Sequence, residues 1–496
     1  MFTGLFGPLA LCIQAVFARN GNAMRAPIAP IPRIYNDGPV MSRNGTQLPP
    51  YSPIILSTPG EGNAEPFTGY LTNGTINGQI AQQQNGSTIV LEHRYYGLSN
   101  PVPNLSGKNL RYHTIHQAIE DLVYFANNVD LPQMNGAGLS PATAPWILIG
   151  GSYSGALTSW TMVNHPDVFW AGYASSAVVE AILDYWSYFE IIREFMPANC
   201  SADIAVVIAY VDEVFSSSDT LTHLDDVAGV RNNLWDWQSL QPETGPGAKF
   251  FESCDALEVK NGVNAPATGW GLENALSAWG SFWNSSYIDF LCGEEGVVDC
   301  LGTYNPNSTY FTSTALDNAD RSWTWIICNE VGFLQEGPPP AGDLSAIVTR
   351  IVQPDYDIRQ CAYMFSDVFA SPADVPTAAG IANVNSAYKG WNISVDRLFF
   401  ANGQRDPWRA STVSADGVDR PSTETQPIAI GNGFHTSDLL TANGRVDPTV
   451  LAVQNEALAY MKIWLAEWTP PSISPKREEP YSRKVNSSRF FKGIVV

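Results

Sequence analysis

Basic residues are scarce in this sequence. The 496-residue chain has 27 Lys and Arg residues against 48 Asp and Glu residues, which gives a net charge of −21 at pH 7. Nucleic acids and anionic membranes are bound mainly through clustered Lys and Arg side chains, so we expect neither as a partner. An acidic surface also suits work at low pH, because carboxylates that take up protons no longer repel one another.

Long apolar runs are absent after the first residues. The stretch from Leu5 to Ala18 is too short to span a bilayer, but it has the length of the hydrophobic part of a signal peptide. We therefore expect residues 1–18 to be a signal peptide, although the usual positive residues before the apolar stretch are missing. No later segment has an apolar run long enough for a membrane helix. The predicted localisation is secreted, with the lysosome or vacuole as the alternative.

Cysteines paired at CxxC spacing are also absent. Seven cysteines occur, and Cys12 lies in the predicted signal peptide, which leaves an even six. In an oxidising compartment six cysteines predict three disulfides, with 15 possible pairings. No histidine cluster lies near them, which argues against a zinc site, and we expect neither a metal nor a cofactor.

Sequons for N-glycosylation are frequent, which favours secretion. None of them has proline in the middle position, and we expect glycosylation at these residues. They are Asn44, Asn73, Asn85, Asn104, Asn199, Asn284, Asn307, Asn392 and Asn486.

Strand and helix candidates alternate near both ends of the chain. This order predicts a parallel sheet covered by helices on both faces. The strand candidates are residues 52–58, 87–93, 146–150, 395–403 and 425–433, and the helix candidates are residues 112–129 and 447–468.

The middle of the chain has a different character. All six remaining cysteines lie between Cys200 and Cys361, and helix candidates at 180–196 and 203–217 alternate with loops rich in Gly, Asn and Ser. Because the chain is longer than one core usually supports, we predict an α/β core split by an inserted, mostly helical domain with disulfides. The predicted limits are 1–18 for the signal peptide, 19–178 for the first part of the core, 179–385 for the inserted domain, 386–468 for the second part of the core and 469–496 for a mobile C-terminal tail.

Residues 146–160, WILIGGSYSGALTSW, place Ser152 between an apolar strand and a helix. Glycines on both sides of this serine permit the sharp turn called a nucleophile elbow, in which the hydroxyl stands clear of the backbone. In the common pattern G-x-S-x-G the last position is glycine, and here Ser154 occupies it as a second candidate nucleophile. We favour Ser152, because it directly follows the strand and two glycines. The N–H of Tyr153 is then a candidate oxyanion donor.

A serine nucleophile needs a histidine as base and a carboxylate that orients the histidine. In α/β-hydrolases these residues follow the serine in the order Asp, His, each on a loop after a strand. Of the six histidines, only His435 lies in the second part of the core, after a strand candidate and a Gly-Asn-Gly turn. Asp406 lies on the loop after the preceding strand candidate. The sequence therefore predicts an α/β-hydrolase core with a triad of Ser152, Asp406 and His435.

Five segments resemble signatures of the secreted and lysosomal proline-specific serine peptidases. This family includes lysosomal Pro-X carboxypeptidase, dipeptidyl peptidase II and the acid prolyl endopeptidases of filamentous fungi. The segments are EHRYYG (92–97), GGSYSGALTSW (150–160), RSWTWIICNEVGF (321–333), NGQRDPW (402–408) and GNGFHTSDL (431–439). They follow the family's order along the chain.

The resemblance implies that Ser152 is the nucleophile, His435 the general base and acid, and Asp406 the orienting carboxylate. It also implies cleavage on the carboxyl side of proline, with proline-containing peptides or proteins as partners, and an acidic working pH. Trp408 matches a tryptophan at the family's apolar pocket, and a flat ring suits the side chain of proline; ordinary core packing is the alternative. Glu330 is a candidate for holding a substrate amino group, with a structural salt bridge as the alternative.

Several points stay open at this stage. The second oxyanion donor comes either from the TPGEG loop (58–62) or from the pair Tyr95–Tyr96. The charge pattern of the EHR segment favours an internal charge network over a chemical role; its residues are Glu92, His93 and Arg94. Endopeptidase or carboxypeptidase action is favoured over dipeptidyl release, and the sequence does not predict an oligomeric state.

Rival activities fit the sequence less well. A lipase or carboxylesterase shares the elbow and triad, but it is expected to carry an HGGG-type loop where this chain has TPGEG. A non-catalytic relative is expected to have lost a member of the triad, and none is lost here. A retaining glycosidase needs two facing carboxylates, whereas neighbours such as Glu294 and Glu295 point apart on an extended chain.

Overall fold

The computed structural model of the chain describes residues 52–129, 139–216, 228–244, 247–294, 296–341 and 345–471, together with the short strand β1 (Ile34–Tyr35). The predicted signal peptide, the sequons at Asn44 and Asn486, and residues 472–496 of the predicted tail lie outside the described residues.

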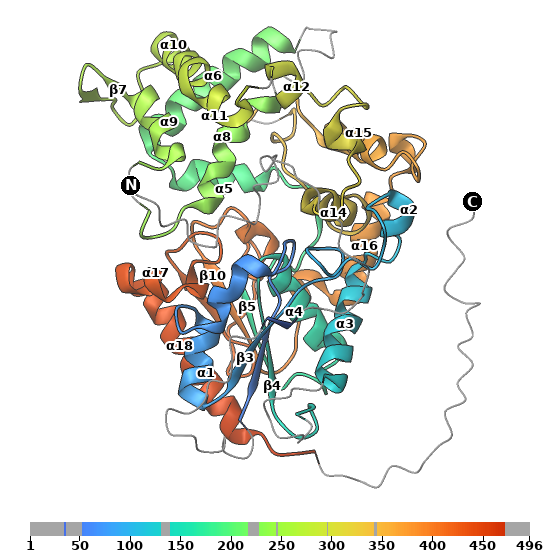
Figure 1. Cartoon of the computed structure of the whole chain (residues 1–496). Helices are drawn as coiled ribbons and strands as arrows, with labels where there is room; N and C mark the ends of the chain where they lie inside the picture. Colours follow the sequence, from blue (N-terminus) through green and yellow to red (C-terminus); the bar gives the residue numbers. More distant parts are fainter. Residues whose placement is uncertain are drawn as a thin grey trace, which may run out of the picture.

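A seven-stranded sheet forms the centre of the lower half of the molecule (Figure 1). The strands lie in the order β1-β3-β2-β4-β5-β10-β11; β1 pairs antiparallel with β3, and every other pairing in this sheet is parallel. The six strands after β1 are β2 (Ile54–Ser57), β3 (Ser87–Leu91), β4 (Trp146–Gly151), β5 (Ala171–Ser175), β10 (Leu398–Gly403) and β11 (Ile428–Gly431). The five predicted strands are therefore confirmed, and β5 is an additional one.

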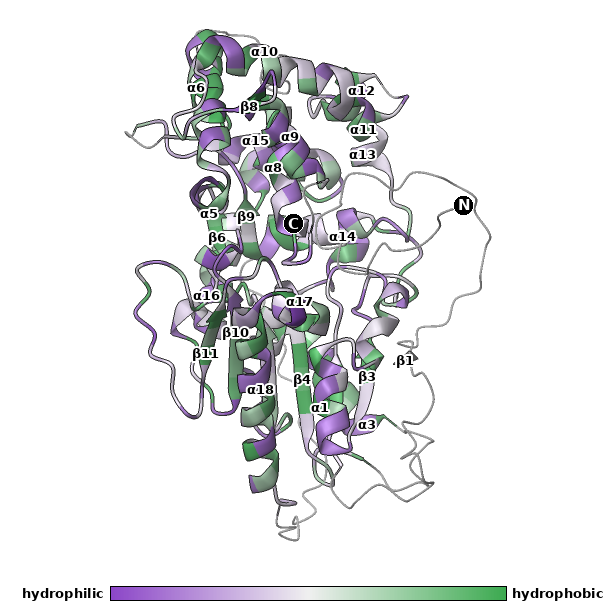
Figure 2. Cartoon of the chain, turned by 90° about the vertical axis from the view of Figure 1, so that its left-hand side faces the viewer, coloured by the Kyte–Doolittle hydropathy of each residue, from purple (hydrophilic) through white to green (hydrophobic). Residues whose placement is uncertain are grey.

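Helices cover both faces of this sheet, as the alternation along the chain predicts. Ile55 and Ile147 belong to the core under α1 (Ile76–Gln84) and α18 (Pro448–Glu467). Their neighbours Ile54 and Leu148 belong to the opposite core, with α3 (Ile115–Asn128) and α4 (Tyr153–Asn164). Figure 2 shows α1 and α18 in front of strands that are mostly hydrophobic. Strands buried on both faces require apolar residues at successive positions, which is why the sequence shows them as short apolar runs.

The central strand β5 is not predicted from the sequence, because most of its residues, AGYAS, are small. A methyl group on Gly172 would lie 2.2 Å from the Sδ of Met162 and 2.8 Å from a methyl carbon of Leu398. Only glycine therefore lets the neighbouring helix pack this closely on the sheet. A strand with few β-branched residues gives little propensity signal.

Two of the predicted helices end within one residue of the observed helices, at residues 128 and 467. The helix predicted at 112–129 begins at Ile115, because the hydroxyl of Thr114 accepts a hydrogen bond from the N–H of Gln117 and caps the helix. The helix predicted at 447–468 is α18, which Asp447 caps in the same way. The helices of the core are α1, α2 (Gly107–Leu110), α3 (Ile115–Asn128), α4 (Tyr153–Asn164), α16 (Thr377–Tyr388), α17 (Thr441–Val446) and α18.

The helix predicted at 180–196 is wrong in its first half. Residues Ile182–Asp184 form strand β6, which pairs in parallel with β9 (Gly332–Leu334) to make a separate two-stranded sheet. Only α5 (Ser187–Phe195) is helical. The apolar residues of this stretch fit a helical repeat, but pairing with β9 holds residues 182–184 in an extended strand.

Most of the other helices between β5 and β10 form the upper half of the molecule (Figure 1). The predicted domain limit at residue 385 falls inside α16, and the limits themselves stay a prediction. These helices are α5, α6 (Ala198–Phe215), α8 (Asn232–Trp235), α9 (Lys249–Glu258), α10 (Leu272–Phe282), α11 (Ile288–Cys292), α12 (Val297–Leu301), α13 (Thr309–Thr312), α14 (Ala319–Ile326) and α15 (Pro354–Met364).

Three disulfides join these helices, which confirms the number expected from six cysteines. Cys200–Cys254 links α6 to α9, Cys292–Cys300 links α11 to α12, and Cys328–Cys361 links the turn before β9 to α15. A disulfide removes freedom from the unfolded chain, so each pair stabilises the inserted helices.

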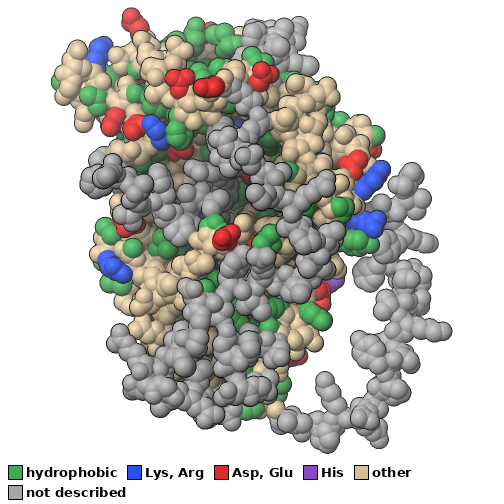
Figure 3. Space-filling model, viewed as in Figure 1, with side chains coloured by type: hydrophobic (Ala, Val, Ile, Leu, Met, Phe, Trp, Pro, Cys, Tyr) green, Lys and Arg blue, Asp and Glu red, His purple; other side chains and the backbone are tan. Residues whose placement is uncertain are grey.

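The surface carries the acidic character of the sequence. On the face that Figure 3 shows, acidic side chains gather over the upper helices, with few basic ones among them. Within the described ranges we find no helix with the length and apolar character that a bilayer span requires. Five of the sequon asparagines are exposed, namely Asn73, Asn85, Asn284, Asn307 and Asn392, whereas Asn104 and Asn199 are half-buried.

Candidate active site

Ser152 occupies a strained turn between β4 and α4. Its backbone has φ 60° and ψ −127°, a conformation that residues other than glycine rarely adopt. A methyl group on Gly150 would lie 2.1 Å from the carbonyl oxygen of Ser154, and one on Gly155 would lie 2.7 Å from the carbonyl oxygen of Ser175. The glycines on both sides of the serine are therefore required by close backbone contacts. This is the local geometry of a nucleophile elbow.

The two serines of this turn have different surroundings. Ser152 lines a narrow pocket, whereas Ser154 is not among the residues that line it. The hydroxyl of Ser154 is buried and faces Gly60, where an added methyl group would lie 2.5 Å from it. A hydroxyl sealed under a neighbouring loop has no access to substrate, so the geometry favours Ser152 as nucleophile.

Asp406 and His435 lie in contact on the loops that follow β10 and β11. The Nδ1 atom of His435 is 2.9 Å from the Oδ1 atom of Asp406, and their side chains are 3% and 0% exposed. Because an ionised carboxylate can only accept, this contact places the proton of a neutral imidazole on Nδ1. The Nε2 atom of His435 is buried and has no hydrogen-bond partner among the described residues, so it is free to accept a proton.

The turn of Ser152 lies against the turn of His435. A methyl group on Gly151 would lie 3.0 Å from the Cγ2 of Thr436, which directly follows His435. The N–H of Thr436 donates to the hydroxyl of Ser176 at the end of β5. Three loops at the carboxyl ends of β4, β10 and β11 thus bring the serine, aspartate and histidine to one edge of the sheet.

The pocket at Ser152 has apolar walls. Its side chains come from the core (Val178 and Trp408) and from the inserted helices and β9 (Trp323 and Phe333). The cavity volume is only about 10 Å³, which is roughly the room that one water molecule needs. A larger group can enter only if some of these side chains move.

Trp408 forms the wall of this pocket on the side of the triad. Its ring centroid lies 5.3 Å from that of Phe333 and 6.2 Å from that of His435. Its indole Nε1–H donates to the Oε1 of Gln238 at 2.5 Å, and its backbone N–H donates to Asp406. The side chain is therefore fixed between the aspartate and the inserted domain.

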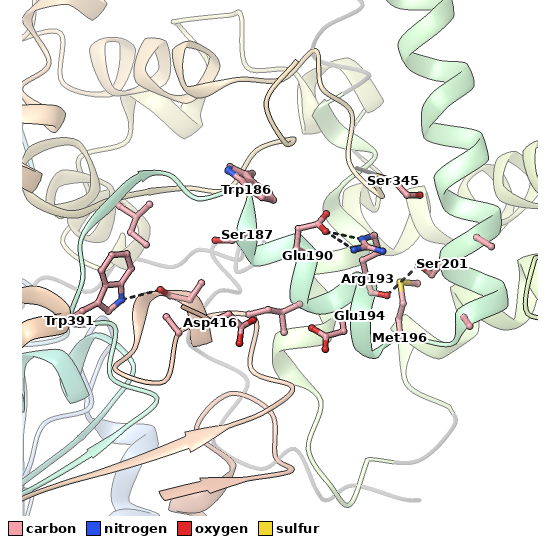
Figure 4. A pocket seen from close by; sticks show the side chains of 16 residues that line it. Trp186, Ser187, Glu190, Arg193, Glu194, Met196, Ser201, Ser345, Trp391 and Asp416 are labelled. Carbon is pink, nitrogen blue, oxygen red and sulfur yellow. Dashed lines mark hydrogen bonds and ion pairs between the residues drawn. The ribbon is translucent and has the colours of Figure 1, made fainter. Parts of the chain in front are cut away.

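A much larger cavity of about 890 Å³ lies beside this site (Figure 4). Ala410, two residues after Trp408, lines it, together with Trp186, Trp391 and the ion pair of Glu190 with Arg193. No member of the Ser152, Asp406 and His435 set lines this cavity. We therefore place the candidate active site at the smaller pocket, because the candidate nucleophile Ser152 lines it.

The TPGEG loop contributes Glu61 to the pocket of Ser152. Its Oε2 atom is buried and has no hydrogen-bond partner in the part of the chain that the structure describes, and burial raises the pKa of this carboxyl group to about 8. Below that pH the group is neutral and can donate a hydrogen bond. Neither tyrosine of the Tyr95–Tyr96 pair lines the pocket, and the hydroxyl of Tyr95 donates to the carbonyl oxygen of Asn109 instead.

Tyr153 is the first residue of α4, so its backbone N–H has no partner within the helix. Its side chain is buried, and its hydroxyl lies 3.2 Å from the Nε2 of His93. This contact holds the first turn of α4 against the loop after β3. The predicted oxyanion donor is thus at the correct end of the helix, beside Ser152.

Glu330 has a different environment from the one expected for a substrate ligand. Its Oε2 accepts a hydrogen bond of 2.9 Å from the N–H of Ile115, at the start of α3, and it does not line the pocket. Burial raises the pKa of Glu330 to about 7. The structure therefore favours a helix-capping role for this carboxyl group over a substrate-binding one.

The EHR segment forms the internal network that its charge pattern favours. Glu92 accepts backbone N–H groups from Ala64, after the TPGEG loop, and from Leu98 and Ser99. Arg94 forms a bidentate ion pair with Asp121. Glu92 thus fixes the loop that carries Glu61, and Arg94 joins the segment after β3 to the helix 115–128.

Three residues that line the pocket are not among the site residues predicted from the sequence. They are Val178, Trp323 and Phe333. Trp323 and Phe333 belong to the RSWTWIICNEVGF segment, in which only Glu330 was selected by its charge. The aromatic residues of that segment are the signal that could have identified them. Val178 follows β5, which is itself not among the predicted strands.

Comparison with known proteins agrees with this geometry. The family model Peptidase_S28, described as serine carboxypeptidase S28, matches residues 44–235 and 286–457. The chain is 35% identical over 454 residues to the serine protease vicPa of Bipolaris victoriae (strain FI3), an alignment that covers 84% of this chain and 83% of the relative. It is 28% identical over 458 residues to a probable extracellular serine carboxypeptidase of Arthroderma benhamiae, which covers 83% of this chain and 62% of the relative.

The solved structures that align with this chain are more distant. A Bacillus megaterium epoxide hydrolase aligns over 87% of this chain and 96% of that chain, at 10% identity and a TM-score of 0.32, which is too low to carry an argument. The family match covers most of the chain, including the three loops that meet at the sheet edge. The chain therefore belongs to the S28 family of serine peptidases.

Proposed function

We propose that this S28 serine peptidase is secreted and hydrolyses peptide bonds on the carboxyl side of proline at acidic pH. Its catalytic residues are Ser152, Asp406 and His435. The observation that carries the proposal is the buried contact of His435 with Asp406 beside the pocket that Ser152 lines. The mode of action is endopeptidase or carboxypeptidase, with dipeptidyl release as the alternative.

The proposed mechanism starts with proton transfer from Ser152 to His435. As the Oγ of Ser152 attacks the carbonyl carbon, the Nε2 of His435 takes its proton, and Asp406 stabilises the imidazolium. His435 then gives this proton to the leaving amine, and the acyl group stays on Ser152. A water molecule then loses a proton to His435 and attacks the acyl carbon, and His435 returns this proton to the Oγ of Ser152 as the acid product leaves.

Two donors stabilise the negative oxygen of the tetrahedral intermediate. The first is the backbone N–H of Tyr153, at the positive end of α4. The second is the neutral carboxyl group of Glu61, whose unpartnered oxygen in the pocket supports this role. An acid with a pKa of about 8 is protonated over the whole acidic range, which fits acidic activity.

Proline is recognised by the apolar walls of the pocket. Trp323, Phe333 and Trp408 offer flat aromatic faces, and the pyrrolidine ring is apolar with no N–H to satisfy. Because the cavity is smaller than this ring, we expect Trp323 or Phe333 of the inserted domain to move when substrate binds.

A carboxylesterase or lipase is the alternative activity. It would use the same triad, but a buried acid in the pocket and aromatic walls fit a prolyl residue better than a long acyl chain. Membership of the S28 serine peptidase family also favours peptides over esters as substrates.

Secretion has three supporting observations. All six cysteines of the described residues are in disulfides, as expected in an oxidising compartment. Five sequon asparagines are exposed and accessible to glycosylation. The name of the Arthroderma benhamiae relative also describes an extracellular protein.

The test uses the secreted chain with peptides that contain proline and have free or blocked ends. Mass spectrometry of the digests from pH 4 to pH 7 locates every cut. Cuts after proline are expected, and cuts in doubly blocked peptides assign endopeptidase action, whereas cuts only near a free carboxyl end assign carboxypeptidase action. Hydrolysis of esters without any cut after proline would overturn the proposal.

A further inference from the structure

Residues 236–241 of the inserted domain, DWQSLQ, lie directly against the candidate triad. They form the short helix η3 (Asp236–Ser239) and the turn that follows it. They lie outside the two ranges, 44–235 and 286–457, in which this chain matches the S28 family model. Their contacts are therefore a property of this chain that the family match does not describe.

Gln241 holds the turn of His435 from two sides. Its Nε2 donates to the backbone carbonyl oxygen of His435 at 3.3 Å. Its Oε1 accepts from the hydroxyl of Ser437 at 2.7 Å and from the amide of Asn443 at 2.8 Å. The oxygen of the Ser437 hydroxyl in turn accepts the N–H of Phe434, so one glutamine fixes the backbone before and after the imidazole.

This turn needs such support, because its conformation is strained. Thr436 has φ 54°, in the left-handed region that β-branched residues avoid. Without an external hold, the backbone is expected to relax, and the imidazole would move with it. A shift of about 1 Å in a catalytic group can reduce turnover about 100-fold.

The two neighbouring side chains hold the other half of the site. The indole Nε1–H of Trp237 donates to the carbonyl oxygen of Arg405, which precedes Asp406, at 2.9 Å. The Oε1 of Gln238 accepts from the indole of Trp408 at 2.5 Å and from the hydroxyl of Tyr188 at 3.0 Å. The side chains of Trp237, Gln238, Trp408 and Tyr188 are buried.

We propose that Gln241 is a positioning residue for His435 and that Gln238 is a positioning residue for Trp408. The inserted domain thereby sets the geometry of both the general base and the pocket wall. This inference rests on the proposed function, because it takes His435 as the base and Trp408 as part of the proline pocket.

The two glutamines predict different kinetic losses. Gln241→Ala frees the turn of His435 and lowers kcat about 10- to 100-fold with KM little changed, the range typical when a residue that orients a catalytic group is lost. Gln238→Ala frees Trp408 and mainly raises KM for peptides with proline before the cut. Gln353→Ala is the matched control, because all the side-chain hydrogen bonds of Gln353 among the described residues go to backbone carbonyls of the inserted domain.

Gln241→Glu gives a readout that loss of structure alone would not produce. A protonated glutamic acid can donate to the carbonyl oxygen of His435 as the amide does, whereas a carboxylate cannot. Its activity relative to the wild type should therefore fall as pH rises from 4 to 7. The segments that contact Gln241 carry the charged or titratable residues Asp236, Glu243, His435, Asp438 and Arg445, and Asp406 bonds His435; all of them are present in both proteins.

The full-length chain and its variants are assayed on one proline peptide, with thermal melting as the check on folding. A kcat of Gln241→Ala equal to that of Gln353→Ala overturns the inference. If Gln241→Ala does not fold, the Gln241→Glu activity ratio decides, and a ratio independent of pH overturns it. Ser152→Ala separates the two proposals: cleavage that persists in that variant refutes the proposed function itself, whatever the glutamine variants do.

Discussion

The Nδ1 of His435 lies 2.9 Å from the Oδ1 of Asp406, and both side chains are buried at the edge of the sheet next to Ser152. The same carboxylate oxygen accepts the backbone N–H of Trp408 at 2.9 Å, while the second oxygen is buried and has no hydrogen-bond partner among the described residues. Asp406 is therefore fixed by its own loop before it orients the imidazole. In the proposed mechanism its charge stabilises the imidazolium of His435.

Asp406→Asn should lower kcat by about 10³- to 10⁴-fold, because an amide can hold the imidazole in the wrong tautomer. Single-turnover and steady-state assays on one proline peptide measure this loss. Asp416→Asn is the control, since Asp416 lies on the same loop but is 82% exposed and pairs with Arg409. An equal loss in both variants would contradict the assigned role.

Glu61 should set the alkaline limit of activity. Burial raises the pKa of Glu61 to about 8, so the donor form is present at acidic and neutral pH and is lost as pH rises through about 8. Glu61→Gln keeps a neutral donor, and we expect it to remain active and to lose this alkaline limb. Glu61→Ala should be weak at every pH. A Glu61→Gln enzyme with the unchanged alkaline limb would exclude Glu61 as the second oxyanion donor.

Trp408 should determine the preference for proline. In Trp408→Ala the aromatic wall is lost, and kcat/KM for a proline peptide should fall about 10-fold or more relative to the same peptide with alanine, as expected for an altered apolar pocket. Trp391→Ala is a matched control in the large neighbouring cavity. If both variants keep the wild-type ratio of proline to alanine cleavage, the pocket has been placed wrongly.

Stability should be greatest at acidic pH. Burial raises the pKa of several carboxyl groups, so in the folded chain they keep protons that the unfolded chain loses near pH ~4. The affected groups with the largest shifts are Asp236 and Asp438 at about 6, Asp320 and Glu330 at about 7, Glu61 at about 8 and Glu336 at about 10. The stability of the folded state is therefore lost progressively as pH rises through these values.

Two buried histidines act in the opposite direction. Burial lowers the pKa of His93 to about 4 and that of His113 well below its usual range, which costs stability as pH falls below about 6.5. The carboxyl groups outnumber them, so Tm should fall from about pH 5 towards pH 8. Glu336→Gln should flatten this fall, since Glu336 is fully buried beside Asp357 and burial raises its pKa to about 10. A Tm that rises with pH in this range would contradict the account.

The sequence predicts the triad and most of the sheet because both are local patterns. Ser152, Asp406 and His435 each follow an apolar strand within a few residues, and parallel strands bring their carboxyl ends to one edge. The number of disulfides follows from counting cysteines, whereas the pairing depends on how the inserted helices pack.

Features that depend on distant packing are not visible in the sequence. Strand β5 is made of small residues whose role appears only when Gly172 meets Met162. The pairing of β6 with β9 overrides a helical repeat. Gln241 carries no motif at all, and its role comes from contacts with residues almost two hundred positions away in the chain.

The most direct test of the central claim is covalent labelling with a fluorophosphonate probe, followed by peptide mapping in a mass spectrometer. We predict one labelled residue, Ser152, in the wild type and in Ser154→Ala, and no label in Ser152→Ala. Labelling of His435→Ala should be slowed by orders of magnitude, because the base that activates the serine is gone. Label on Ser154, or a labelled and active Ser152→Ala enzyme, would contradict the account.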